Sequence, residues 1–315
     1  MLKFLFRRLV VLLAALLVVS ILAFLIPYVS GPEPAEMIMH ARVSDLAVDP
    51  DTIAALRVQL GLDRPLAVQY LDWLGNAIRG DFGFTFTDRL PVSVHIKYAF
   101  VVSITLALSA LILALVVALP LGAIAALKPA GKFDNAITFL TQILVAIPEY
   151  WLAPMATLVF AVYLQWLPSA GWTGPEHVIL PALALALRPM AYFTRVMRAS
   201  MIDVLEAPYI TAALSRGLGL GQTIRRHGVR NAMTPVITLF AMWLSGLIGG
   251  AVVIEVIFSI PGMGRLLYEA VVNKDLPVLQ GTIMCLVSFA VLMSTITDFI
   301  YVLINPAVRI KDASA

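Results

Sequence analysis

The sequence predicts an all-α protein with six transmembrane helices, both termini in the cytoplasm, one large external segment and one long cytoplasmic loop. Three observations lead to this fold class. Hydrophobic residues make up 61% of the 315 residues and charged residues only 13%, which is far from the composition of a soluble domain. Several apolar stretches are long enough to cross a hydrocarbon core of about 30 Å. The lysines and arginines are concentrated between alternate stretches, which orients the chain.

The first apolar stretch, residues 9–26, follows the basic residues Lys3, Arg7 and Arg8. Its 18 residues are just enough for one crossing. A cleaved signal peptide is the alternative, but the stretch is longer than a usual signal core and no clean small-x-small site follows it. We therefore expect residues 1–29 to be a retained first transmembrane helix.

Residues 30–100 form the one substantial polar segment. Between Gly31 and Tyr98 it holds nine acidic and six basic residues, so it lacks the positive excess of a cytoplasmic loop. Residues 51–60 carry apolar side chains on one face of a predicted helix. We expect this segment to be external (periplasmic) and partly helical.

Residues 101–304 are predicted to form a five-helix core, followed by a cytoplasmic tail at 305–315. The third apolar stretch of the chain is too long for one straight helix, and Pro148 and Pro154 are expected to interrupt it. In the fifth stretch, Gly246 and Gly250 have the four-residue spacing that lets two helix backbones approach closely. The core spans are expected at residues 101–127, at 136–167, from His177 toward Arg195, at 232–258 and at 281–304.

The most polar part of this core, residues 195–235, holds six arginines against two acidic residues. If the chain has six spans and both termini lie inside, 13 lysines and arginines are on the cytoplasmic side and eight are outside. Six of these eight lie in the long external segment, where the positive-inside rule is weak. Residues 211–217 are typical of a helix end that Gly217 closes with a left-handed turn. We expect a protruding helix–turn–helix within a cytoplasmic loop at 199–230, which a soluble partner could grip.

Four ionisable residues lie within the predicted spans and are candidates for a translocation pathway, because charge in a membrane is costly and usually functional: Glu149, Arg188, Glu255 and Asp298. For Glu149, beside a proline break, a structural hydrogen bond is an equal alternative. Arg188 is most simply explained by a partner carboxylate in this chain or in a neighbouring subunit. Glu255 and Asp298 lie near the expected interfaces, so hydration explains them as well as function does.

Catalytic motifs are missing from the sequence. It has no GxxxxGK[ST] phosphate loop, and the glycine-rich residues 217–222 lack both the lysine and a preceding strand. It has no HExxH, no GxSxG and no Cys/His cluster, and its one cysteine, Cys285, is most simply a small buried hydrophobe. We therefore predict that the chain is not an enzyme and itself binds no cofactor, metal or nucleic acid.

Several segments of the sequence are similar to the sequences of one protein family. Ala212-Ala213 followed by Gly217 resembles the EAA…G cytoplasmic loop of permease subunits of ATP-binding-cassette importers, with Thr211 at the usual acidic position. The RHGVRNA phrase at 226–232, closed by Pro235, is similar to the variant of the dipeptide, oligopeptide and nickel branch. Four further segments are similar to the same branch: LGLDRPL at 60–66, RGDFG at 79–83, HVILP at 177–181 and FSIPGMGRLL at 258–267.

The resemblance implies a permease subunit in the bacterial inner membrane. Its expected partners are a second, homologous permease in a heterodimer, two ATP-binding subunits that use ATP and Mg, an extracytoplasmic substrate-binding protein and membrane lipid. Gly246 and Gly250 then become candidates for permease–permease packing. Nucleotide-driven closure of the ATPases would reach the pore as a rigid-body movement. The residues expected to couple the chain to the ATPase are Thr211, Ala212, Ala213, Arg216, Gly217, Leu218, Gly219, Leu220 and Gly221.

Two other classes of protein stay open at this point. An ion-coupled secondary transporter would need an ion relay and inverted repeats, and neither is clear in this sequence. An ATP-independent channel or scaffold would leave the arginine-rich loop explained by topology alone. The cargo is open as well: the family base rate favours di- and oligopeptides, with nickel or a metal chelate as the alternative and glutathione also carried in this branch.

Overall fold

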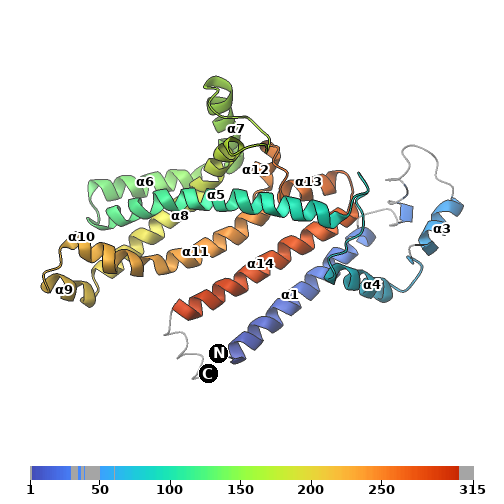
Figure 1. The fold of residues 1–315 in the computed structure, drawn as a ribbon, viewed down its shortest axis with the longest axis horizontal. Coiled ribbons are helices and arrows are strands. Elements are labelled where there is room, and N and C mark those ends of the chain that lie inside the picture. Colours follow the sequence, from blue (N-terminus) through green and yellow to red (C-terminus); the bar gives the residue numbers. More distant parts are fainter. Residues whose placement is uncertain (1, 30–34, 37–38, 40–49, 60, 305–315) are drawn as a thin grey trace. The chain divides into compact units, whose positions relative to one another are not determined.

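A computed structural model describes residues 2–29, 35–36, 39, 50–59 and 61–304. In these ranges the chain is built from helices, with no strand beyond an isolated antiparallel bridge between Phe84 and Pro91 (Figure 1). The expected tail at 305–315 lies outside the described residues. The chain divides into two compact units: unit 1 is residues 1–102 with 261–292, and unit 2 is residues 103–260 with 293–315.

Among the described residues, five helices are long and apolar enough to cross a membrane. A sixth crossing results if the pair Lys132–Ala146 and Glu149–Tyr163, bent by 95°, counts as one broken span. This confirms the prediction of an all-helical, multi-pass membrane protein. The five long spans are Phe6–Val29, Val92–Ala126, Glu176–Leu205, Leu220–Gly250 and Leu276–Thr297.

Unit 1 is built from two chain segments, residues 1–102 and 261–292, which are joined by hydrogen bonds. Ser20 and the Tyr70 hydroxyl are 2.8 Å apart, and Gln280 Nε2 donates to the carbonyl of Ala23 at 3.1 Å, so three helices meet. An apolar cluster that includes Ile96 and Met263 packs beside them. The helices of unit 1 are α1 (Leu2–Val29), α3 (Pro50–Gln59), α4 (Leu66–Ile78), α13 (Met263–Val272) and the first parts of α5 (Val92–Ala126) and α14 (Leu276–Ile304).

Unit 2 is organised around the long helix α8 (Glu176–Leu205), whose buried face is rich in alanine. Figure 1 shows α6 (Lys132–Ala146) and α11 (Val229–Gly250) running beside it. Helix α5 approaches α8 closely at Gly122, because a Cβ there would lie 2.6 Å from the Thr194 carbonyl oxygen. The shorter elements are α7 (Glu149–Ala156), the π-helix η1 (Thr157–Tyr163), α9 (Pro208–Ser215), α10 (Leu220–Thr223), the π-helix η2 (Ile224–Gly228) and α12 (Val252–Ile257).

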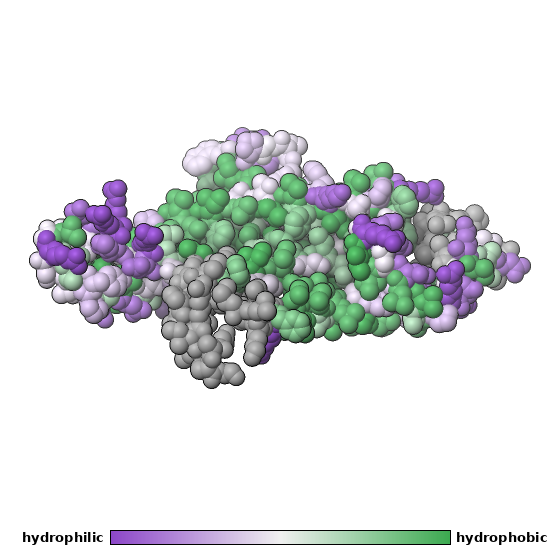
Figure 2. All heavy atoms as spheres, turned by 60° about the horizontal axis from the view of Figure 1, so that its bottom comes forward, coloured by the Kyte–Doolittle hydropathy of each residue, from purple (hydrophilic) through white to green (hydrophobic). Residues whose placement is uncertain are grey.

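The two ends of unit 2 differ in their elements and in their polarity. Helices α9 and α10 lie at one end, and α7 and α12 lie at the other (Figure 1). Figure 2 shows hydrophilic residues gathered over the α9–α10 end and hydrophobic residues over the long helices next to it. An apolar belt beside a polar end is the arrangement expected of helices that leave a membrane.

Several helix boundaries differ from the sequence prediction. Helix α5 begins at Val92, so residues 92–100 form its first turns rather than part of a loop. The break in the third span comes before Glu149, as predicted for Pro148, but the prediction that Pro154 interrupts the helix is wrong, since Pro154 lies inside α7. The fifth span ends at Gly250 and not at Phe258, because α12 is a separate helix after Ala251.

Candidate functional site

The residues at the α9–α10 end of unit 2 form a helix–turn–helix, which we call the tip segment (residues 208–221). Ala207 is extended and Pro208 opens α9, a position where the missing proline N–H costs nothing. Ile210 and Ala213 are buried against the body of unit 2. Thr211 and Ala212, between them, are exposed. One face of α9 is therefore anchored and the other faces outward.

A left-handed turn ends α9, as the sequence predicted. Gly217 has a φ of +87°, a conformation that glycine adopts at little cost. The Gly217 N–H donates to the Leu214 carbonyl at 2.9 Å, and the Leu218 N–H donates to the Ala213 carbonyl at 3.3 Å. This pair of bonds is the Schellman arrangement, which fixes the direction in which the chain leaves the helix.

The rest of the tip segment is mostly exposed. Arg216, Gly219 and Gly221 are exposed and Leu218 is half-buried. Two apolar side chains also reach outward, with exposed fractions of 39% for Leu214 and 57% for Leu220. The predicted coupling residues thus lie together, and only Ala213 among them is buried.

Side-chain contacts hold the tip segment to the helices on either side. Asn231 Nδ2 donates to the Tyr209 hydroxyl at 3.2 Å, which joins α11 to α9. On the other side, only Glu206 and Ala207 separate α9 from the end of α8. The η2 segment that follows α10 is in van der Waals contact with α8, since a Cβ on Gly228 would lie 3.4 Å from Met201 Sδ. A force applied to the tip segment would therefore reach both α8 and α11.

Two of the four predicted pathway residues come together. Arg188 on α8 places a guanidinium nitrogen 3.7 Å from Glu149 Oε1, at the start of α7 and just past the 95° bend. The carboxylate partner expected for Arg188 is therefore in this chain. Both side chains are partly exposed in the chain taken alone.

Glu255 has a different environment from the one expected. It lies on α12 with an exposed fraction of 0%, and Ser103 Oγ donates to its Oε1 at 2.6 Å. Of the two alternatives for this carboxylate, hydration does not fit, because α12 places it in the interior of unit 2. Asp298 lies on α14, and its side chain is outside the described part of the structure.

The glycines of the fifth span face outward. Gly246 and Gly250 are exposed, and a Cβ on either would meet no atom within 4 Å. No contact among the described residues uses their small size.

Sequence reasoning missed a pair of contacts between α6 and α8. Arg198 donates from Nε to Asp134 Oδ1 and from NH2 to Oδ2, the latter at 2.6 Å, and the Ala130 N–H donates to Oδ2 at 2.8 Å. Arg195 Nε donates to Thr141 Oγ1 at 3.2 Å. We call these four side chains the α6–α8 clamp. Arg195 and Arg198 count among the six arginines of residues 195–235 that orient the chain, and their three-residue spacing also puts them on one helix face.

In the described part of the chain, no three His, Cys, Asp or Glu side chains come together as a group. The apolar spans and the polar tip segment are those of a multi-pass membrane protein.

The comparisons with known proteins then define the family. The model of the "binding-protein-dependent transport system inner membrane component" family matches residues 118–310, and the model of its N-terminal part matches residues 1–107. The chain belongs to this family, and is thus the membrane permease component of an ATP-binding-cassette importer and not its ATPase subunit.

Relatives match along nearly the whole chain. A putative peptide transport system permease protein of Brucella abortus is 37% identical over 311 residues, covering 96% of this chain and 98% of its own. The glutathione transport system permease protein of Escherichia coli K12 is 34% identical over 311 residues, covering 99% of this chain and 100% of its own.

Proposed function

We propose that this chain forms one half of the translocation pathway of an importer for short peptides, and that the tip segment transmits the work of separate ATPase subunits to it. The observation that carries the proposal is the tip segment itself: an exposed helix–turn–helix, closed at Gly217 and tied to two long helices. A permease without an ATPase motif needs such a contact if its transport is driven uphill.

In this proposal the bent pair α6–α7 is one broken span, which makes six spans with both termini and the tip segment in the cytoplasm. The charge distribution supports this orientation, since the opposite one would place the six arginines of residues 195–235 outside. The long external segment would then meet the substrate-binding protein on which this class of transport depends.

A second, similar permease would complete the pathway, and two ATPase subunits would bind ATP and Mg. The outward-facing Gly246 and Gly250 are suited to a close helix–helix contact with that permease. The Arg188–Glu149 pair is suited to line the pathway, because it combines charge with partial exposure at a broken span.

For the cargo, both relatives described above carry names that refer to peptides or to glutathione, itself a tripeptide. Short peptides are therefore our proposal. Titration of the partner binding protein with dipeptides, oligopeptides, glutathione and Ni²⁺ tests it, and selective binding of Ni²⁺ or a metal chelate would replace it.

Coupling is tested by Gly217→Val in the complete transporter reconstituted in vesicles. A β-branched residue is strained at a φ of +87°, so the turn must rearrange. We expect ATP-driven peptide uptake to fall at least about tenfold, as a change of roughly 1.4 kcal/mol in the docked state would produce, with membrane insertion unchanged. Gly75→Val is the matched control, because Gly75 lies in helix α4 outside the tip segment, has no positive φ, and a Cβ there would meet no atom within 4 Å. Full uptake by Gly217→Val would contradict the coupling role.

A further inference from the structure

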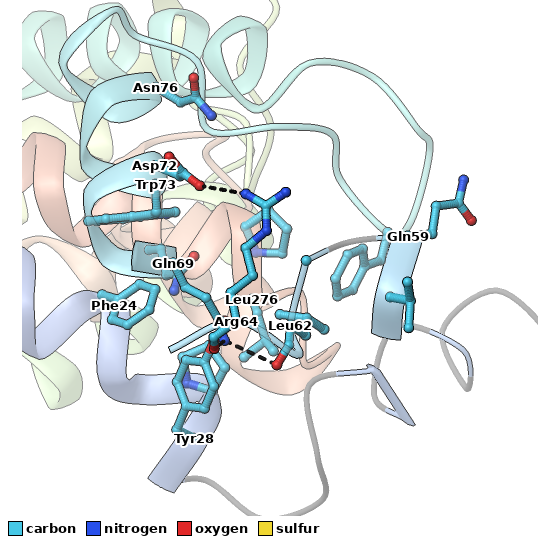
Figure 3. A pocket seen from close by; sticks show the side chains of 16 residues that line it. Phe24, Tyr28, Gln59, Leu62, Arg64, Gln69, Asp72, Trp73, Asn76 and Leu276 are labelled. Atoms are coloured by element: carbon cyan, nitrogen blue, oxygen red, sulfur yellow. Dashed lines mark hydrogen bonds and ion pairs between the residues drawn. The ribbon is translucent and has the colours of Figure 1, made fainter. Parts of the chain in front are cut away.

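Unit 1 contains a pocket of about 410 Å³ that the transport proposal leaves unused (Figure 3). Pockets of this size accommodate small ligands. The ends of α1 and α3, residues 61–64, one face of α4 and the start of α14 contribute to its lining. All of these segments belong to unit 1.

One wall of the pocket is aromatic. Phe24 is the centre of a cluster in which its ring centroid lies 5.3 Å from that of Tyr28, 5.5 Å from that of Tyr70 and 5.9 Å from that of Trp73. Phe24, Tyr28 and Trp73 line the pocket. Such a wall favours the apolar or aromatic part of a ligand.

Two opposite charges line the same pocket. Arg64 NH1 lies 3.4 Å from Asp72 Oδ2, and Figure 3 shows the Arg64 side chain extending across the pocket toward α4. The two side chains are 60% and 64% exposed, so this ion pair contributes little to stability and both groups can turn to a ligand.

The loop that carries Arg64 is fixed by hydrogen bonds. Gln69 Nε2 donates to the Leu62 carbonyl at 3.1 Å and to the Arg64 carbonyl at 2.7 Å. The Tyr28 hydroxyl donates to Gln69 Oε1, which secures the amide in this orientation. At the loop's start Gly61 has a φ of +67°, and a Cβ there would lie 3.4 Å from Arg64 Nε. The backbone of the site is thus held by hydrogen bonds within the chain.

We propose that this pocket binds a small molecule with a free α-amino-acid head and an apolar remainder. In such a head the ammonium nitrogen and the carboxylate carbon are about 2.5 Å apart by standard bond lengths. The carboxylate would pair with Arg64, the ammonium with Asp72, and the remainder would lie on Trp73 and Phe24. The termini of an α-linked peptide are separated by at least one further residue of about 3.5 Å, which fits charges 3.4 Å apart less well.

The proposal is independent of ATP hydrolysis and relies on the proposed function only for the external placement of the segment. Binding is measured by saturation-transfer NMR on the full-length chain in nanodiscs, without ATPase or binding protein. The probe is L-phenylalanine, compared with phenethylamine, which lacks the carboxylate, with 3-phenylpropanoate, which lacks the ammonium, and with the α-linked dipeptide Ala-Phe.

We expect L-phenylalanine to bind at least about tenfold more tightly than each comparison compound, since each lacks or misplaces one charge-assisted contact. Arg64→Gln and Asp72→Asn should each reduce L-phenylalanine binding by a similar factor. Arg79→Gln and Asp63→Asn are the matched controls, because both residues are exposed in the same segment and neither lines the pocket.

Three results would overturn the proposal. They are equal binding of L-phenylalanine and its single-charge analogues, unchanged binding by the Arg64 and Asp72 variants, and a signal that disappears in nanodiscs rich in phosphatidylethanolamine, which would make the site a lipid headgroup site. If the coupling test fails while L-phenylalanine binds as expected, the proposed function is contradicted and the proposed binding site is not.

Discussion

Replacing Asp134 by alanine should destabilise the protein more than replacing an exposed acidic residue does. Asp134 is 2% exposed and accepts hydrogen bonds from two nitrogens of Arg198 and from the Ala130 N–H. The variant removes all three bonds and leaves the guanidinium on α8 without its carboxylate.

The magnitude follows from the burial of the two partners. Breaking a fully buried ion pair by removing one partner costs about 3–5 kcal/mol. The Arg198 side chain is 29% exposed, so water can take up part of the lost interaction. We therefore expect a cost of about 2–3 kcal/mol, which corresponds to a decrease in melting temperature of roughly 3–5 °C for a chain of this size.

Thermal unfolding of the purified chain in detergent checks this value. Asp203→Asn, an exposed carboxylate on the same helix α8, is the control and should change the melting temperature little. Because the two partners interact directly, Asp134→Ala combined with Arg198→Gln should cost less than the sum of the single variants. Equal effects of Asp134→Ala and Asp203→Asn, or strictly additive costs in the double variant, would refute the clamp.

Three further predictions concern other contacts. Gly122→Val should cost about 1–3 kcal/mol in thermal unfolding, because its Cβ would meet the backbone oxygen of Thr194, and an unshifted melting temperature would contradict the close approach of α5 and α8. Glu255→Gln, which keeps an acceptor for Ser103, should be milder than Glu255→Ala by about 2 kcal/mol, and equal melting temperatures would show that the buried contact does not matter. Hydrogen bonds from the Thr85 hydroxyl and then from the Leu90 N–H lower the pKa of Asp88 below its ordinary value of 3.8, so the stabilisation by this carboxylate is complete above that value and is lost as the pH falls through the lowered pKa. The melting temperatures of the wild type and of Asp88→Asn should therefore converge in acid, and a difference that stays constant with pH would contradict this.

Much of the helical architecture could be predicted because membrane crossing imposes a length and a polarity on each helix. The broken third span followed from Pro148, and the left-handed turn followed from Gly217, since these two residue types restrict or permit particular backbone angles. The effect of Pro154 was not predictable in the same way, because a proline inside a helix can be accommodated when neighbouring packing supports it.

Pairings between distant segments were harder to predict. Hydropathy places Arg198 at the start of a charged loop, and only the packing of α6 on α8 shows that Asp134 neutralises it. Glu255 near the end of a predicted span could equally face water, and its burial follows from the break at Ala251 between α11 and α12, which no periodic pattern marks. The Arg188–Glu149 pair was half predicted: the need for a carboxylate was clear, and its identity required the bend before α7.

The central claim is that the tip segment contacts an ATPase subunit, and site-directed photo-crosslinking tests it most directly. In a Cys285→Ser background, which removes the one native cysteine, a benzophenone is attached to Leu220→Cys in the tip segment or to Val271→Cys on α13, both exposed positions. We predict that irradiation of the assembled transporter joins the ATPase subunit to position 220 and not to position 271. Absence of a crosslink from position 220, or an ATPase crosslink from position 271, would contradict the account.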